Sequence, residues 1–230
     1  MTSTASTTDS IATGTRPAAT ATATSATIPG AMVAAVLGPL ALAASNLCFA
    51  VVTADGQAAD TAAYLELLRE HDTLVEVGSA LGLLACLCLV PAVWAVTGRL
   101  RELRPRLAST GGWLMGSGYV MGVALSVEAL LALSVARSDQ SPAGLVDGID
   151  HHMTTTATGM WTVFGIGALL GGLVLGVAML RRADVPRWCG PALIASEPVR
   201  VIGLLSGVEV LTALASVLIL LAFVGVLRRR

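Results

Sequence analysis

The stretch 192–205, ALIASEPVRVIGLL, decides the fold of this chain. A glutamate, a proline and an arginine interrupt a segment that is otherwise apolar. Such a segment is either a loop at a membrane surface or a membrane span that carries charges inside it. The choice sets the number of spans, and with it the side of the membrane on which each loop lies.

The composition indicates a membrane protein. The 230 residues are 55% hydrophobic and only 13% charged, with a mean hydropathy of +0.79, whereas soluble domains carry about 25% charged residues. The formal net charge of -1 excludes a strong basic attraction to nucleic acid. Every basic residue is an arginine, so chemistry that needs a lysine, such as a Schiff base or a P-loop, is excluded.

Four apolar runs are long enough to cross the membrane. A hydrocarbon core of about 30 Å takes about 20 apolar residues, and the runs that qualify are 30–53, 74–97, 112–136 and 160–180. Between the first two, residues 60–71 predict a short outer helix that Asp60 caps, with Tyr64, Leu67 and Leu68 on one face.

The last apolar stretch, 187–227, is too long for one span. As a straight helix it would reach about 60 Å, twice the thickness of the hydrocarbon core. We therefore expect two spans, 187–206 and 209–227, with Gly207 in the turn between them. The alternative is a cytoplasmic surface segment, 187–200, followed by a single span, 201–227.

Arginine placement favours six spans over five. The positive-inside rule places the arginine-rich loops 98–111 and 181–187 in the cytoplasm. With six spans the terminal Arg-Arg-Arg, 228–230, is cytoplasmic too, whereas with five it lies outside, against the rule. We therefore expect an all-α, polytopic transmembrane bundle over 29–227, in the plasma membrane, with both termini cytoplasmic.

The segment 1–28 consists almost entirely of Thr, Ala and Ser. It cannot bury enough apolar surface to offset its chain entropy, so we expect a disordered cytoplasmic tail.

Small residues predict how the helices associate. Lipid tails are as apolar as leucine, so close packing at small residues drives association instead. Glycines four residues apart recur at 78/82, 112/116, 118/122, 167/171, 172/176 and 203/207. This pattern favours a compact intramolecular bundle and leaves a homo-oligomer open. Asn46 is expected to hydrogen-bond across helices.

Three charges fall inside the expected spans. Six spans place Glu197 near the bilayer midplane, with Arg200 three residues outward on the same helix face. Glu128 in the third span lies at a depth similar to that of Arg200. Such charges cost a few kcal/mol each unless they are paired, so we hypothesise a buried cluster of the three. It would be a structural ion network, a proton or ion relay, or an anchor for a polar ligand.

The three histidines, His71, His151 and His152, all fall on the expected outer side beside carboxylates. Histidine and carboxylate side chains bind zinc and other divalent metals, so an outward-facing metal-dependent membrane enzyme is an alternative. The sequence has no HExxH, G-x-S-x-G, P-loop or CxxC pattern, which argues against an enzyme. No cofactor is implied.

Two stretches carry a resemblance: LVPAVWAVTGRLRELRPRLASTGGWLMGSG (89–118) and VPRWCGPALIASEPVRVIGLLSG (185–207). A Val-Pro that closes a span, an arginine-rich turn with PRLA and a later Pro-Arg-Trp resemble small multi-pass membrane proteins of unknown function from high-GC, actinobacterial-type bacteria. The resemblance covers about 30–227 and implies that Pro-Arg-Trp opens the fifth span. It implies no activity and no functional residue.

The expected function is therefore coarse. We expect an integral protein of the lipid bilayer with a binding, sensing or structural role and an unknown small-molecule or ion ligand. The alternative is a small carrier, coupled to protons or ions, that uses Glu128, Glu197 and Arg200.

Overall fold

The computed structural model describes residues 29–54, 60–138 and 155–228. Within these ranges the chain forms helices and no strand, which confirms the all-α prediction. The expected disordered tail, 1–28, lies outside the described residues. The helices are α1 (Pro29–Val52), α2 (Thr61–Glu70), α3 (Asp72–Arg101), α4 (Pro105–Ala136), α6 (Thr155–Leu180), α7 (Cys189–Ser206) and α8 (Glu209–Arg228).

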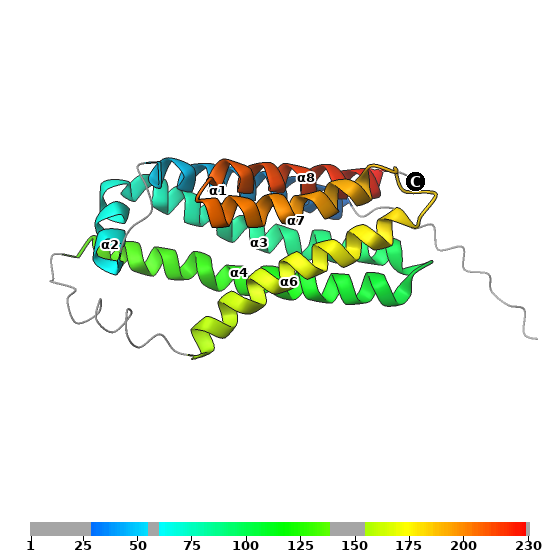
Figure 1. Cartoon of the computed structure of the whole chain (residues 1–230), viewed down its shortest axis with the longest axis horizontal. Helices are drawn as coiled ribbons and strands as arrows, with labels where there is room; N and C mark the ends of the chain where they lie inside the picture. Colours follow the sequence, from blue (N-terminus) through cyan, green and yellow to red (C-terminus); the bar gives the residue numbers. More distant parts are fainter. Residues whose placement is uncertain (1–28, 55–59, 139–154, 229–230) are drawn as a thin grey trace, which may run out of the picture.

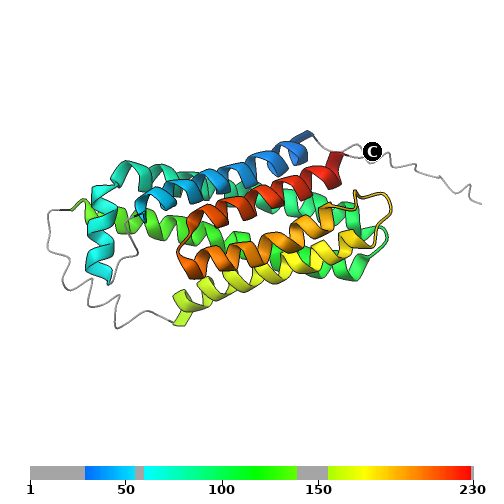
Figure 2. The same cartoon turned by 45° about the horizontal axis from the view of Figure 1, so that its top comes forward.

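The six long helices form a closed ring in which each packs against two neighbours. The cyclic order is α1, α3, α4, α6, α7, α8, and α8 returns to pack on α1. Figures 1 and 2 show α7 lying beside α8 in the bundle, while the short helix α2 covers the opposite end from Arg228. The ring encloses an interior that side chains from every long helix can reach.

Five helices are long and apolar enough to cross a membrane: α1, α3, α4, α8 and the Thr158–Leu180 part of α6. The helix α7 is not among them, because its 18 residues include Glu197 and Arg200. It is nevertheless about 27 Å long and lies between α6 and α8. Gly207 ends α7 in the left-handed conformation, with φ 69°, as predicted for the turn into α8.

Glycines bring α4 and α6 into backbone contact, as the glycine pairs predict. A Cβ atom on Gly118 would lie 2.6 Å from the backbone nitrogen of Ala168, and one on Gly171 would overlap the backbone of Met115. Across the same contact, a Cβ on Gly167 would lie 2.9 Å from the carbonyl oxygen of Leu114. The two helices therefore touch along a seam that admits no larger residue.

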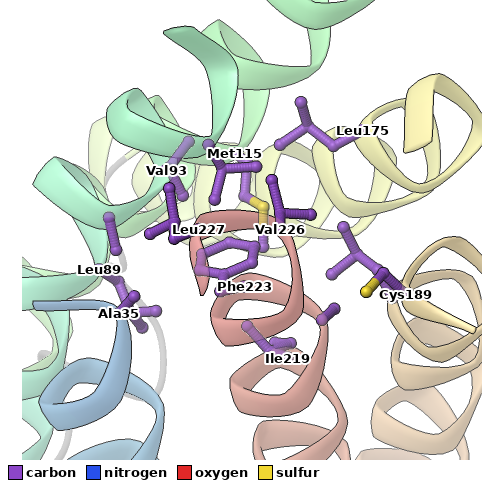
Figure 3. Close-up of a cluster of buried hydrophobic side chains, with 14 of the residues drawn as sticks. Ala35, Leu89, Val93, Met115, Leu175, Cys189, Ile219, Phe223, Val226 and Leu227 are labelled. Carbon is purple, nitrogen blue, oxygen red and sulfur yellow. The ribbon is translucent and has the colours of Figure 1, made fainter. Parts of the chain in front are cut away.

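The apolar core lies inside the ring, nearer the end where α8 finishes. Figure 3 shows the Phe223 ring of α8 enclosed by side chains from neighbouring helices, among them Val93 and Met115. A polar contact joins two helices outside this core: the Asn46 side-chain nitrogen donates to the Ser216 hydroxyl over 3.4 Å. This contact confirms the interhelical role expected of Asn46.

We call the end that holds the α3–α4 and α6–α7 turns and Arg228 the basic end. Its described arginines are Arg99, Arg101, Arg104, Arg106, Arg181, Arg182, Arg187 and Arg228. The Arg182 side chain is only 4% exposed, and it donates to both oxygens of Asp184 and to the Arg99 carbonyl. These bonds lower the pKa of Asp184 and fasten the α6–α7 turn to α3.

The opposite end, which we call the α2 end, is acidic. Asp60 caps α2 as predicted, accepting a hydrogen bond from the Ala63 nitrogen over 2.8 Å. The predicted apolar face is partly wrong, because α2 buries Leu65 and Leu68 and leaves Tyr64 exposed. Leu65 and Leu68 pack in a small cluster with Leu133 of α4, which sets the rotation of α2.

The glycine seam predicts that two glycines of α6 respond differently to replacement by alanine. Gly171→Ala should destabilise the protein by about 1–3 kcal/mol, because the added methyl meets the α4 backbone and cannot be accommodated by a rotamer change. Gly165→Ala is the matched control in α6, since a Cβ there meets nothing within 4 Å. Thermal unfolding in detergent should show a lower midpoint for the first variant alone, and equal midpoints would contradict the seam.

Candidate functional site

The helix α7 carries a carboxylate into the interior of the ring. Glu197 stands at the middle of α7 and is only 1% exposed. It points at α6, where a Cβ on Gly172 would overlap the carboxylate. Gly172 therefore provides the space that this charged side chain occupies.

Glu197 and Arg200 have unmet polar atoms in the bundle. The Ser196 hydroxyl donates to Oε1 of Glu197 over 3.3 Å, but Oε2 of Glu197 and Nη2 of Arg200 are buried and find no hydrogen-bond partner among the described residues. Arg200 interacts electrostatically with Tyr119 of α4, with Glu197 and with Cys86 of α3. We call Glu197, Arg200 and Tyr119 the buried polar cluster.

Glu128 has a different partner. The indole nitrogen of Trp161 in α6 donates to Oε2 of Glu128 over 3.2 Å, and no ion pair joins Glu128 to Arg200 within the described ranges. The structure thus places Glu197 and Arg200 of the hypothesised cluster near each other, whereas Glu128 lies against Trp161.

A cavity of about 310 Å³ lies between these two sites. Its lining residues come from α1, α2, α3, α4 and α6: Leu42, Ser45, Asn46, Phe49, Tyr64, Ser79, Gly82, Cys86, Gly122, Leu125, Ser126, Glu128, Ala129, Ala132, Trp161 and Phe164.

Exposure distinguishes a mouth from a floor in this cavity. Tyr64, Glu128 and Trp161 are exposed, whereas Ser79, Cys86 and Gly122 are buried. The mouth therefore lies toward the α2 end, where the partial burial of Tyr64, which is 37% exposed, and the neighbouring Glu128 carboxylate raise the pKa of the Tyr64 hydroxyl. At the floor, Cys86 both lines the cavity and lies within electrostatic reach of Arg200.

Gly82 lies between two serine hydroxyls in the cavity wall, and a third serine hydroxyl in that wall is unsatisfied. A Cβ on Gly82 would lie 3.1 Å from the Ser126 hydroxyl and 3.2 Å from the Ser45 hydroxyl. Ser79, which is 2% exposed, has a buried hydroxyl with no partner among the described residues. A polar group inside the cavity would satisfy it.

Sequence reasoning missed Tyr119, Cys86 and Trp161. Tyr119 had a usable signal, since it is a tyrosine in the middle of a glycine-rich span and a buried hydroxyl needs a partner. Trp161 stands near the start of α6, and the only sequence signal for it was the general preference of tryptophan for the ends of spans.

The hypothesised metal site remains a prediction. His71 follows the last residue of α2, whereas His151 and His152 lie outside the described residues. In the part of the chain that the structure describes, no group of three or more His, Cys, Asp or Glu side chains is arranged to hold a metal ion.

These features define a class: an all-helical bundle with helices apolar enough to cross a membrane, and with a cavity and buried charges inside it. A family model described as a domain of unknown function (DUF4386) matches residues 31–228, so the chain belongs to that family. No curated protein and no solved structure matches the chain. The family match extends over nearly the whole ring but brings no activity with it.

The buried polar cluster predicts a coupling between its two charges. No ion pair joins Glu197 to Arg200 among the described residues, so their attraction acts over a longer distance than a direct salt bridge. Arg200→Gln should destabilise the protein by about 1–3 kcal/mol, because it removes a nearby positive charge from the buried Glu197 carboxylate. In the double variant with Glu197→Gln, much of that loss should be recovered. Denaturant unfolding of both single variants and the double variant gives the coupling energy, which should exceed about 1 kcal/mol. Additive losses would mean that the two side chains do not interact.

Proposed function

We propose that the protein is a six-span, multi-pass protein of a bacterial plasma membrane that binds a small ligand in its interior cavity. The cavity carries the proposal, since about 310 Å³ is within the size range of small-molecule sites and its walls come from five helices. The cavity lies within the ring, and the exposed residues among its described lining, Tyr64, Glu128 and Trp161, all lie toward the α2 end.

The charge distribution supports six spans with both termini in the cytoplasm. The basic end holds the arginine-rich turns and Arg228, whereas the described acids Asp60, Glu66, Glu70, Asp72, Glu76 and Glu209 gather at the α2 end. Arginine-rich loops face the cytoplasm, so the cavity mouth faces outward. The place of α7 between α6 and α8 supports counting it as the fifth span.

Unmet polar groups favour binding over a purely structural role. A buried donor or acceptor without a partner costs about 1–3 kcal/mol. Ser79 and Glu197 each have such an atom among the described residues, whereas the Arg200 guanidinium lies against the Tyr119 hydroxyl. A packed structural core would be more stable with apolar residues at these positions, whereas a bound polar molecule or ordered water would satisfy them.

A small carrier coupled to protons or ions is the second candidate. The observation in its favour is that the cavity floor at Cys86 borders Arg200, so the cavity and the buried polar cluster follow one another through the bundle. Glu197 would bind and release the proton or ion. Glu197→Gln would then abolish proton uptake into proteoliposomes but leave ligand binding at the mouth. A homo-oligomer, an unassigned ligand and the outward-facing metal-dependent enzyme stay open beside these two candidates.

A reporter fused after Arg230 tests the span count. With six spans, a fluorescent protein that folds only in the cytoplasm should be fluorescent, and a periplasmic phosphatase at the same position should be inactive. A fusion in the α3–α4 turn at Glu102 should behave in the same way and serves as the control. Opposite results for the two fusions would reject six spans and place α7 at the membrane surface.

Water access to the cavity is tested by one pair of cysteine variants. Ser126 lines the cavity, whereas its neighbour Val127 is exposed on the outside of the bundle at the same depth. In a cysteine-free protein in lipid nanodiscs, Ser126→Cys should react with a water-soluble thiosulfonate at least about tenfold faster than Val127→Cys, because lipid excludes charged reagents. Equal rates would mean that the cavity is not a water-filled site.

A further inference from the structure

We infer that the cavity binds a small organic cation with an apolar substituent, whose ammonium lies at Glu128 and whose apolar part extends toward Gly122. This inference rests on the proposed function, because it names the ligand class for the same cavity. It follows from the charge at the mouth, from the aromatic rings beside that charge and from the apolar floor.

The negatively charged residue at the mouth favours a cationic ligand. Glu128 is the only formally charged residue among the described lining residues. It stands eight residues before the end of α4, which places it about 12 Å along the helix from that end. A carboxylate at this depth is costly unless it is paired. No described arginine forms an ion pair with it, and its hydrogen-bond donor is the neutral indole of Trp161.

The hydrogen bond from Trp161 prepares the carboxylate for a ligand. It occupies Oε2 of Glu128, and no described residue donates to Oε1. An ammonium group can therefore approach Oε1 while the indole holds the side chain in place.

Aromatic rings around the carboxylate suit an organic cation better than a metal ion. Phe49, Tyr64, Trp161 and Phe164 all line the cavity. Aromatic faces attract ammonium groups, and the attraction is stronger where water is excluded. A divalent metal ion would instead need several oxygen or nitrogen ligands, and Glu128 is the only carboxylate among the described lining residues.

The floor accepts an apolar group and does not attract a cation. Leu42, Leu125 and Phe164 provide apolar walls, and Gly122 leaves space beside the Cys86 thiol, where a Cβ would lie 2.8 Å from the sulfur. Arg200 lies beyond Cys86, and the nearby Glu197 carboxylate offsets its positive charge, so the floor offers a cation no net attraction. A cation with one apolar arm is therefore bound in one orientation, with its charge at the mouth.

The probe is benzyltrimethylammonium, and 2-methyl-1-phenyl-2-propanol is its neutral counterpart of equal heavy-atom count. Binding is measured as protection of Ser126→Cys from methyl methanethiosulfonate, in the full chain in nanodiscs, because this readout ignores probe that dissolves in lipid. The cation should half-protect the thiol at a concentration at least about tenfold lower than the alcohol does, which is about 1.4 kcal/mol in favour of the charge.

Three variants in the Ser126→Cys background locate that preference. Glu128→Gln should raise the half-protecting concentration of the cation at least about tenfold and leave that of the alcohol unchanged. Glu128→Asp keeps the charge and should retain the preference for the cation, which separates loss of charge from misfolding. Glu66→Gln removes an exposed carboxylate of α2 that does not line the cavity and should change nothing.

Equal protection by cation and alcohol, or a preference that survives Glu128→Gln, would overturn the inference and leave the cavity as a neutral site. The inference also fails if neither probe protects a thiol that the reagent still reaches. If the reagent never reaches Ser126→Cys, the proposed binding function itself fails. The two proposals are thus rejected by different results.

Discussion

The two charges of α7 restrict where this helix can lie in a membrane protein. A carboxylate and a guanidinium three residues apart cannot both face lipid, so this helix is stable only where other helices surround it. It lies between α6 and α8, with Glu197 directed at α6. Close packing at small residues adds to this contact, since a Cβ on Gly190 of α7 would lie 2.9 Å from the carbonyl oxygen of Gly176 in α6.

Glycine makes that position available. The seam of Gly118, Gly167 and Gly171 holds α6 against α4 at backbone distance, and Gly172, the next residue of α6, leaves room for the Glu197 carboxylate. One short run of α6 therefore serves two contacts, one with α4 and one with α7. Both contacts therefore form at the same height along α6.

The sequence predicted the features that depend on the order of residue types along the chain. It did not predict the features that depend on which way a side chain points around its helix. Helix ends, the Asp60 cap and the Gly207 turn follow from local residue types, and the structure has them. The sequence placed Glu128 at the depth of Arg200, which is wrong, because Arg200 lies against Tyr119, nine residues before Glu128 in α4 and about 13 Å away along that helix. Trp161 of α6 contacts Glu128 because of helix rotation and ring order, and a single sequence reveals neither. The cavity, with walls from five helices, was beyond prediction for the same reason.

The order of charges along the cavity limits what the protein can do. If the inferred cation enters at Glu128, it would be attracted at the mouth, whereas the floor at Cys86 adjoins Arg200, whose charge Glu197 offsets. Passage through the bundle would require Glu197 to compensate Arg200, and the partnerless Oε2 of Glu197 leaves that carboxylate able to do so. Protonation of Glu197 would remove the compensation and stop the cation at the floor. The protonation state of Glu197 would thus decide whether the bundle only binds its ligand or also transports it.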